Sequence, residues 1–193
     1  IAINAARIPP TLCYARSQRN NHLLSEAVGL YTAGSLLNGF PSAKRWKQRG
    51  WNIFCKGILD QIDENGEYIQ HSTNYQRLML DEAIWFTVIA QNERESLPEN
   101  VIEKLAQATL YFFNLHDPIS GCVSNLGHQD GSNVLPLVVE DHLDCRSTLQ
   151  AAGRLFLKKD LFPAGSWDEK SCWLGIKPQE KVEQLAAYPL RLG

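Results

Sequence analysis

The length, composition and charge of the chain are ordinary for a soluble globular protein. Its 193 residues suffice for one domain with a sizeable core, and 44% of them are hydrophobic and 21% charged. The formal net charge of −2 gives no global basic field that would attract nucleic acid or an anionic membrane, and no run of about 20 apolar residues could span a bilayer. An anionic partner must therefore be held by a local site.

The cysteines and histidines do not indicate a metal site. The cysteine count is odd and dispersed without a CxxC pair, which argues against a disulfide framework or a zinc cluster and favours plain buried thiols: Cys13, Cys55, Cys122, Cys145 and Cys172. The five histidines show no ligand spacing, so we expect no metal and no cofactor. The chain begins at Ile1 in the middle of a pattern and shows no signal peptide, and we expect it to be a piece of a longer protein.

Helical periodicity dominates the first half of the chain. Apolar residues from Leu23 to Leu37 predict a helix that ends near Asn38-Gly39. Ser42 can cap the next helix, which ends at the turn sequence DENGE, residues 63–67. Its apolar face comprises Trp51, Phe54, Ile58 and Ile62, and its polar face carries Lys44, Arg45, Lys47 and Arg49. These cations are typical of a solvated helix face, although contact with an acidic glycan is an alternative.

Two further helices and a long loop follow. A third helix is expected from Tyr75 to about Asn92, with inward positions at Leu78, Met79, Glu82, Phe86 and Ile89. Ser96 and Glu99 form a capping box, with Pro98 between them, that would begin a fourth helix. Residues 119–141 hold three glycines and no helical period, which indicates a long loop of the kind that is often functional. Helical patterns return at residues 146–159 and 179–187. The fold class is therefore all-α.

The first strong helix begins with three polar side chains, Asn20, Asn21 and His22. Asn is a common helix cap, so these residues could serve the helix alone. The free N–H groups and the positive dipole end of a helix also suit an anionic ligand. The sequence leaves both interpretations open.

Several segments together suggest a family. The runs NNHLLSEAVGLYTAG, WKQRGWNIF and DENGEYIQHSTNYQRLMLD, followed by GHQDGSNVLPL and DHLDCRSTLQAAGRLF, resemble the heparinase II/III family of polysaccharide lyases and its alginate-lyase relatives. The resemblance covers about residues 20–156. It implies an (α/α) toroid of antiparallel helical hairpins, followed in the family by a β-sandwich. Residues 1–193 would be one domain, an incomplete section of the toroid, and they contain no β-sandwich pattern.

The resemblance also implies a reaction. The family cleaves uronic-acid-containing polysaccharides by β-elimination, in which the carboxylate is neutralised, a base removes the proton on the α-carbon and an acid protonates the leaving oxygen. Asn21 matches the family's neutralising Asn and His22 its His, and Glu26, one turn on, could orient the His22 ring. Family habit implies a periplasmic or secreted protein, whereas unpaired cysteines favour a reducing compartment.

Tyr75 matches the family's catalytic Tyr, which protonates the leaving oxygen and in some members also removes the proton. The latter role would need a positive neighbour, such as His22 or Arg77, because the unperturbed pKa of Tyr is near 10. The family often has His after this Tyr, where this chain has Gln76. Its later general-base His cannot be placed here. Gln76 and Arg77 are candidate substrate-binding residues.

The loop sequence Gly127–Gly131 is either a turn or a lining of the substrate groove, with His128 and Asp130 as binding residues. The leading function is thus a lyase acting on an anionic polysaccharide, with no nucleic acid or membrane partner and an undetermined oligomeric state. One alternative is a non-catalytic glycan-binding module. Another is a hydrolase, which needs two carboxylates chosen from Glu26, Asp81, Glu82 and Asp130.

Overall fold

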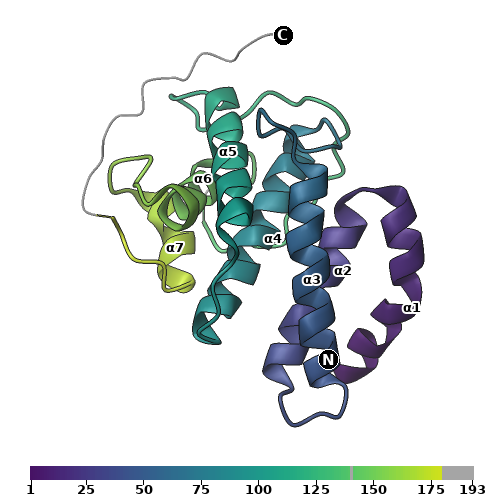
Figure 1. Cartoon of the computed structure of the whole chain (residues 1–193). Helices are drawn as coiled ribbons and strands as arrows, with labels where there is room; N and C mark the ends of the chain where they lie inside the picture. Colours follow the sequence, from purple (N-terminus) through teal and green to yellow (C-terminus); the bar gives the residue numbers. More distant parts are fainter. Residues whose placement is uncertain (140, 180–193) are drawn as a thin grey trace.

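The computed structural model is all-helical over the residues that it describes, 1–139 and 141–179, which confirms the predicted fold class (Figure 1). Its helices are α1 (Ala2–Gln18), α2 (Asn21–Leu36), α3 (Ala43–Gln61), α4 (Thr73–Asn92), α5 (Glu99–Leu115), α6 (Arg146–Ala152) and α7 (Glu169–Trp173). A π-helical segment, Gly153–Leu157, continues α6, and together they form the helix predicted at residues 146–159 except for its last two residues. The helix predicted at residues 179–187 lies outside the described residues apart from its first position.

Two predicted helix caps are wrong. Ser42 occupies the N-cap position of α3, but its side chain makes no capping hydrogen bond. The helix α5 begins at Glu99 with Pro98 as its N-cap, so no capping box forms from Ser96. The reason is steric, because a residue that precedes proline is disfavoured in the helical conformation and Leu97 cannot join the first turn.

Residues 2–18, for which periodicity gave no prediction, form α1. The helix contains Pro9 and Pro10, which are expected to interrupt a helical pattern. Only Ala5, Leu12 and Ala15 are buried, so its apolar stripe is too sparse to recognise. Packing against α2 therefore decides the conformation of this segment.

Helices α2, α3 and α4 define the centre of the fold. Gly34 in α2 faces the start of α3, while Gly57 near the end of α3 faces Leu24, so these two helices are antiparallel. In contrast, α2 and α4 run in the same direction, since Ser25 bonds Glu82 and Tyr31 bonds Glu95. The starts of α2 and α4 consequently lie at the same end of the molecule.

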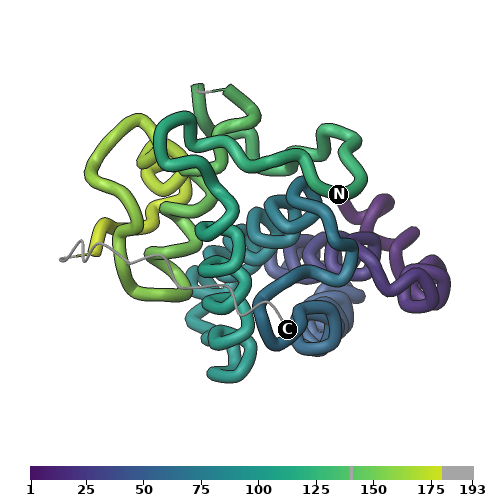
Figure 2. Tube along the Cα trace, turned by 90° about the horizontal axis from the view of Figure 1, so that it is seen from above, coloured from purple at the N-terminus to yellow at the C-terminus, as the bar shows by residue number. Residues whose placement is uncertain are grey.

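The helix α4 lies in the middle of the fold, with α5 and α6 on one side and α2 and α3 on the other (Figure 1). Fifteen of its 20 residues are buried, including polar ones. The long loop between α5 and α6 crosses one end of the helices (Figure 2). Val134 and Leu135 in this loop line the same pocket as Ile1. The loop is thus placed over the start of α4.

Close contact between α2 and α3 generates a stability prediction. A Cβ added at Gly50 would lie 2.6 Å from the Ala27 carbonyl oxygen and 2.6 Å from the Tyr31 backbone nitrogen. Because backbone atoms cannot rotate away, Gly50→Ala should destabilise the protein by about 2 kcal/mol despite its gain in helix propensity. Urea denaturation measures this. Gly39→Ala is the control, since nothing lies within 4 Å of its added Cβ, and equal stability of the two variants would contradict the expected clash.

Candidate functional site

The two asparagines at the start of α2 have different roles. The Asn20 side chain accepts a hydrogen bond from the His22 backbone N–H at 3.1 Å, and its backbone is extended, so Asn20 is the N-cap. The Asn21 backbone N–H donates to Gln70 Oε1 at 2.9 Å. The half-buried Asn21 side chain, however, forms no hydrogen bond with any residue that the structure describes. Capping is therefore complete without the Asn21 amide, which is left available to a ligand.

His22 and Glu26 do not form the contact expected of them. His22 is exposed, whereas one carboxylate oxygen of Glu26 is buried with no hydrogen-bond partner within the described residues. No hydrogen bond joins the two side chains in that part of the chain. The prediction that Glu26 orients the His22 ring is wrong for this conformation, because the carboxylate is turned inward while the ring faces solvent.

Tyr75 and Asp130 meet although 55 residues separate them. Tyr75 lies in the first turn of α4, and its hydroxyl donates to Asp130 Oδ2 at 2.8 Å. The Asn74 amide donates to the other Asp130 oxygen at 3.0 Å. The His128 ring stacks beside the Tyr75 ring, with 6.0 Å between centroids and 10° between planes. The structure thus brings Tyr75, His128 and Asp130 together.

The loop that carries His128 and Asp130 is bound to the start of α4. The Ser72 hydroxyl donates to the His128 carbonyl at 2.6 Å and caps α4 by accepting from the Tyr75 N–H at 3.2 Å. Gly127 has φ of 73°, and a Cβ there would collide with the His71 carbonyl. Glycine is thus required at this position for the loop to approach the helix.

The electrostatics of the Tyr75–Asp130 pair favour a protonated tyrosine. The Ser132 hydroxyl and backbone N–H, followed by Tyr75, hold the pKa of Asp130 well below its usual range. The hydrogen bond to Asp130 raises the pKa of Tyr75, and burial and the carboxylate charge add to the effect. The partner of Tyr75 is therefore a carboxylate rather than the cation that ionisation would require. Tyr75 is suited to donate a proton and not to remove one.

Gln76 and Arg77 are directed inside the protein. Gln76 is 2% exposed, and its amide bonds the Tyr68 N–H and the carbonyls of Gly66 and Ala108. The Arg77 guanidinium is 6% exposed and donates to Asn74 Oδ1 and to the His142 and Ser132 carbonyls, which hold the long loop. The geometry therefore gives both side chains structural roles, and we leave them out of the proposed substrate site.

Comparison with known proteins identifies the family of the chain. Residues 12–130, more than half of the chain, match the family described as "Heparinase II/III N-terminus". The chain belongs to the heparinase II/III family. Within the match lie Asn21, His22, Tyr75, His128 and Asp130.

One curated relative is a heparin-sulfate lyase from Bacteroides thetaiotaomicron, 28% identical over 104 residues. The alignment covers 51% of this chain and 15% of that relative. The heparinase II/III chain thus corresponds to a small part of the lyase it resembles. No solved structure matches it.

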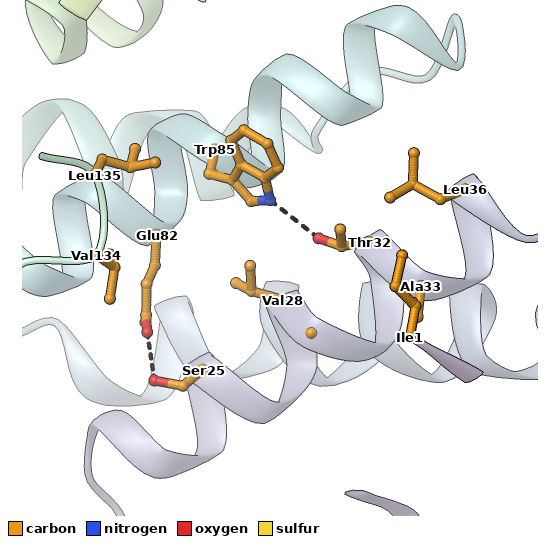
Figure 3. Close-up of a pocket in the computed structure, with 11 residues that line it drawn as sticks. Ile1, Ser25, Val28, Thr32, Ala33, Leu36, Glu82, Trp85, Val134 and Leu135 are labelled. Carbon is orange, nitrogen blue, oxygen red and sulfur yellow. Dashed lines mark hydrogen bonds between the residues drawn. The ribbon is translucent and has the colours of Figure 1, made fainter. Parts of the chain in front are cut away.

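A pocket of about 500 Å³ lies between α2, α4 and the long loop of this heparinase II/III chain (Figure 3). Its walls are mostly apolar, with Val28, Trp85 and Leu135 among them. Glu82 lies in the pocket wall and accepts a hydrogen bond from the Ser25 hydroxyl. The sequence placed Glu82 at an inward position of its helix and among the possible hydrolase carboxylates, but it did not indicate Ser25 as a partner. The available signal was a carboxylate at an inward position of a helix.

Among the described residues, the other acidic and thiol groups form no second site. Asp81 is bound by Lys170 Nζ at 2.7 Å and by the Thr148 hydroxyl at 2.9 Å, so it is not free to act as a hydrolase carboxylate. Within residues 1–139 and 141–179, no group of three or more His, Cys, Asp or Glu side chains could hold a metal ion. The prediction that the cysteines are buried holds fully only for Cys145, since Cys55 and Cys122 are half-buried and Cys13 and Cys172 are exposed. Every helix in this described part is too short or too polar to cross a membrane.

Glu82 generates a prediction of pH-dependent stability. Burial raises its pKa from 4.5 to about 8, so between these values it ionises only in the unfolded chain. Protons are then lost on unfolding, and the free energy of unfolding falls as pH rises through this window. Glu82→Gln, which mimics the protonated acid, should be more stable than wild type at pH 8 by on the order of a few kcal/mol and nearly equal at pH 4.

Urea denaturation of wild type and Glu82→Gln at several pH values measures this difference. Glu64→Gln serves as the control, because it makes the same chemical change at a side chain that is exposed rather than buried. Parallel stability profiles of wild type and Glu82→Gln would show that Glu82 is ionised in the folded protein.

Proposed function

We propose that this chain carries part of the active site of a polysaccharide lyase that cleaves a uronate-containing chain by β-elimination. The main support is the unoccupied Asn21 amide at the start of α2, at the same molecular end as the Tyr75 hydroxyl at the start of α4. Membership of the heparinase II/III family and similarity to a heparin-sulfate lyase support the same reaction class.

Asn21 supplies the neutralising group. Its amide donates to the uronate carboxylate, and the positive end of the α2 dipole adds to that stabilisation. This interaction strengthens as charge moves from the α-carbon onto the carboxylate, so it lowers the barrier to proton removal. His22, the next residue in the chain, is exposed and supplies a second contact for the uronate carboxylate.

Tyr75 supplies the acid. Its proton passes to the glycosidic oxygen as the bond from carbon to that oxygen breaks, and the electron pair from the α-carbon–hydrogen bond forms the new double bond. Asp130 is a positioning residue, because it holds the hydroxyl and keeps it protonated until substrate arrives. The base is a separate group, since the raised pKa of Tyr75 disfavours that role.

Glycan binding without cleavage is the second candidate function. The specific observation in its favour is that the Tyr75 hydroxyl donates its hydrogen bond to the Asp130 carboxylate. Tyr75 is thereby assigned as the proton donor, and the proposed site has no assigned proton acceptor. Binding of an anionic glycan with no unsaturated product in the natural full-length protein would select this function.

The adjacent asparagines allow a matched test. Asn21→Ala should lower lyase turnover in the natural full-length protein by at least about 100-fold, with little loss of stability, because its side-chain amide bonds none of the described residues. Asn20→Ala should lose about 1 kcal/mol of stability through the missing cap, with a much smaller effect on turnover. Turnover is followed by ultraviolet absorbance of the unsaturated uronate, and a reversed pattern would assign the ligand role to Asn20.

Removal of the Tyr75 hydroxyl tests the acid. Tyr75→Phe should reduce turnover by about 10²–10⁴-fold, the usual contribution of a general acid. Tyr14→Phe is the control, as Tyr14 is 65% exposed on α1. Normal turnover by Tyr75→Phe would remove Tyr75 from the mechanism.

A further inference from the structure

A hollow strip runs between α1 and α3. It consists of two adjoining depressions of about 590 and 480 Å³ that share Arg16, Asn52 and Ile53. We call it the α1–α3 groove and define it by its six cations, which are Arg16, Arg19, Lys44, Arg45, Arg49 and Lys56. Their gathering in one place contrasts with the net charge of −2 of the whole chain.

The charges of the groove are not neutralised within the protein. Across residues 1–139 and 141–179, none of the six cationic side chains takes part in an ion pair or a hydrogen bond. The single acidic residue that lines the groove is Asp60. Lys47, from the same sequence run, behaves differently, because it pairs with Glu93 at 2.8 Å and Glu95 at 3.1 Å. Within the described structure, the cations of the groove are therefore unpaired, whereas the neighbouring Lys47 is paired.

The spacing of these residues suits a linear ligand. Lys44, Gln48, Asn52 and Lys56 follow one another at intervals of four and form a continuous stripe on α3. The stripe is about 18 Å long at 1.5 Å per helical residue. Arg16 and Arg19 flank it from α1. An extended polyanion would meet cations along its whole length and from two sides.

We propose that the α1–α3 groove binds a stretch of an anionic polysaccharide outside the Asn21–Tyr75 site. Amide groups on the stripe, Gln48 and Asn52, can bond sugar hydroxyls between the charged contacts. A nucleic acid fits less well, because no aromatic side chain lines either depression and bases would have no stacking platform. This choice of polysaccharide over other polyanions rests on the proposed function.

The position of the groove links it to that site. Leu23, two residues after Asn21, lines the depression that also holds Arg19 and Lys56. A chain bound at the start of α2 can therefore continue along α3. In this arrangement the groove retains the polymer while the site at the start of α2 acts on it.

Binding of labelled heparin and of unsulfated polygalacturonate to the natural full-length protein tests the proposal. Fluorescence polarisation is measured at low and high salt for wild type, R45Q/R49Q/K56Q and the control R7Q/R94Q/K177Q. The control removes the same charge from exposed positions outside the groove. The groove variant should bind at least one of the two polymers about tenfold more weakly at low salt, while the control should stay within about twofold of wild type. Circular dichroism verifies that both variants are folded.

The outcomes separate this proposal from the proposed function. Equal loss of binding in both triple variants, or no loss in either, would overturn the proposal that the α1–α3 groove binds the polymer. Displacement of labelled heparin by oligo(dT) as effective as by unlabelled heparin would overturn the polysaccharide assignment in favour of a general polyanion surface. Tyr75→Phe should bind both polymers as wild type does, so a failure of the lyase proposal would appear in turnover while leaving this binding unchanged.

Discussion

The burial of polar side chains along α4 is the constraint on which the rest of the structure depends. A central helix with polar groups on several faces is stable only if each group finds a partner, because an unpaired buried polar group costs about 1–3 kcal/mol. Gln76 bonds backbone, Asp81 pairs with Lys170, and Arg77 bonds the carbonyls of the long loop. These partners come from distant segments, so satisfying α4 fixes the positions of the loop and of α7 around it.

The same constraint assembles the candidate site. The long loop is held against the start of α4 by Ser72 and Arg77, and this places Asp130 on the Tyr75 hydroxyl. The parallel course of α2 and α4 puts their N-terminal ends together, where free N–H groups and positive dipole ends favour anions. Asn20 completes the cap of α2, and the Asn21 side chain makes no hydrogen bond within the described part of the chain. The contacts that satisfy the polar groups at the start of α4 and the side chains of the candidate site thus lie at the same end of the molecule.

Charge is distributed unevenly, with consequences for binding. Several acidic residues are used in ion pairs inside the protein, such as Asp81 with Lys170 and Asp160 with Arg154. The cations between α1 and α3 have no such partners in the described structure. A weakly acidic protein can therefore present a basic groove to an acidic polymer, and its net charge is no guide to this local property.

The sequence by itself determined the all-α class, the boundaries of α2 and α4 to within about two residues, and the loop between α5 and α6, because these depend on local periodicity and turn residues. It also selected Asn21, Tyr75 and Asp130, but it could not separate the cap from the adjacent amide. Only the tertiary structure paired Tyr75 with a carboxylate rather than a cation, turned Gln76 inward and brought α1 beside α3. These features depend on contacts between residues far apart in the chain, which local patterns do not encode.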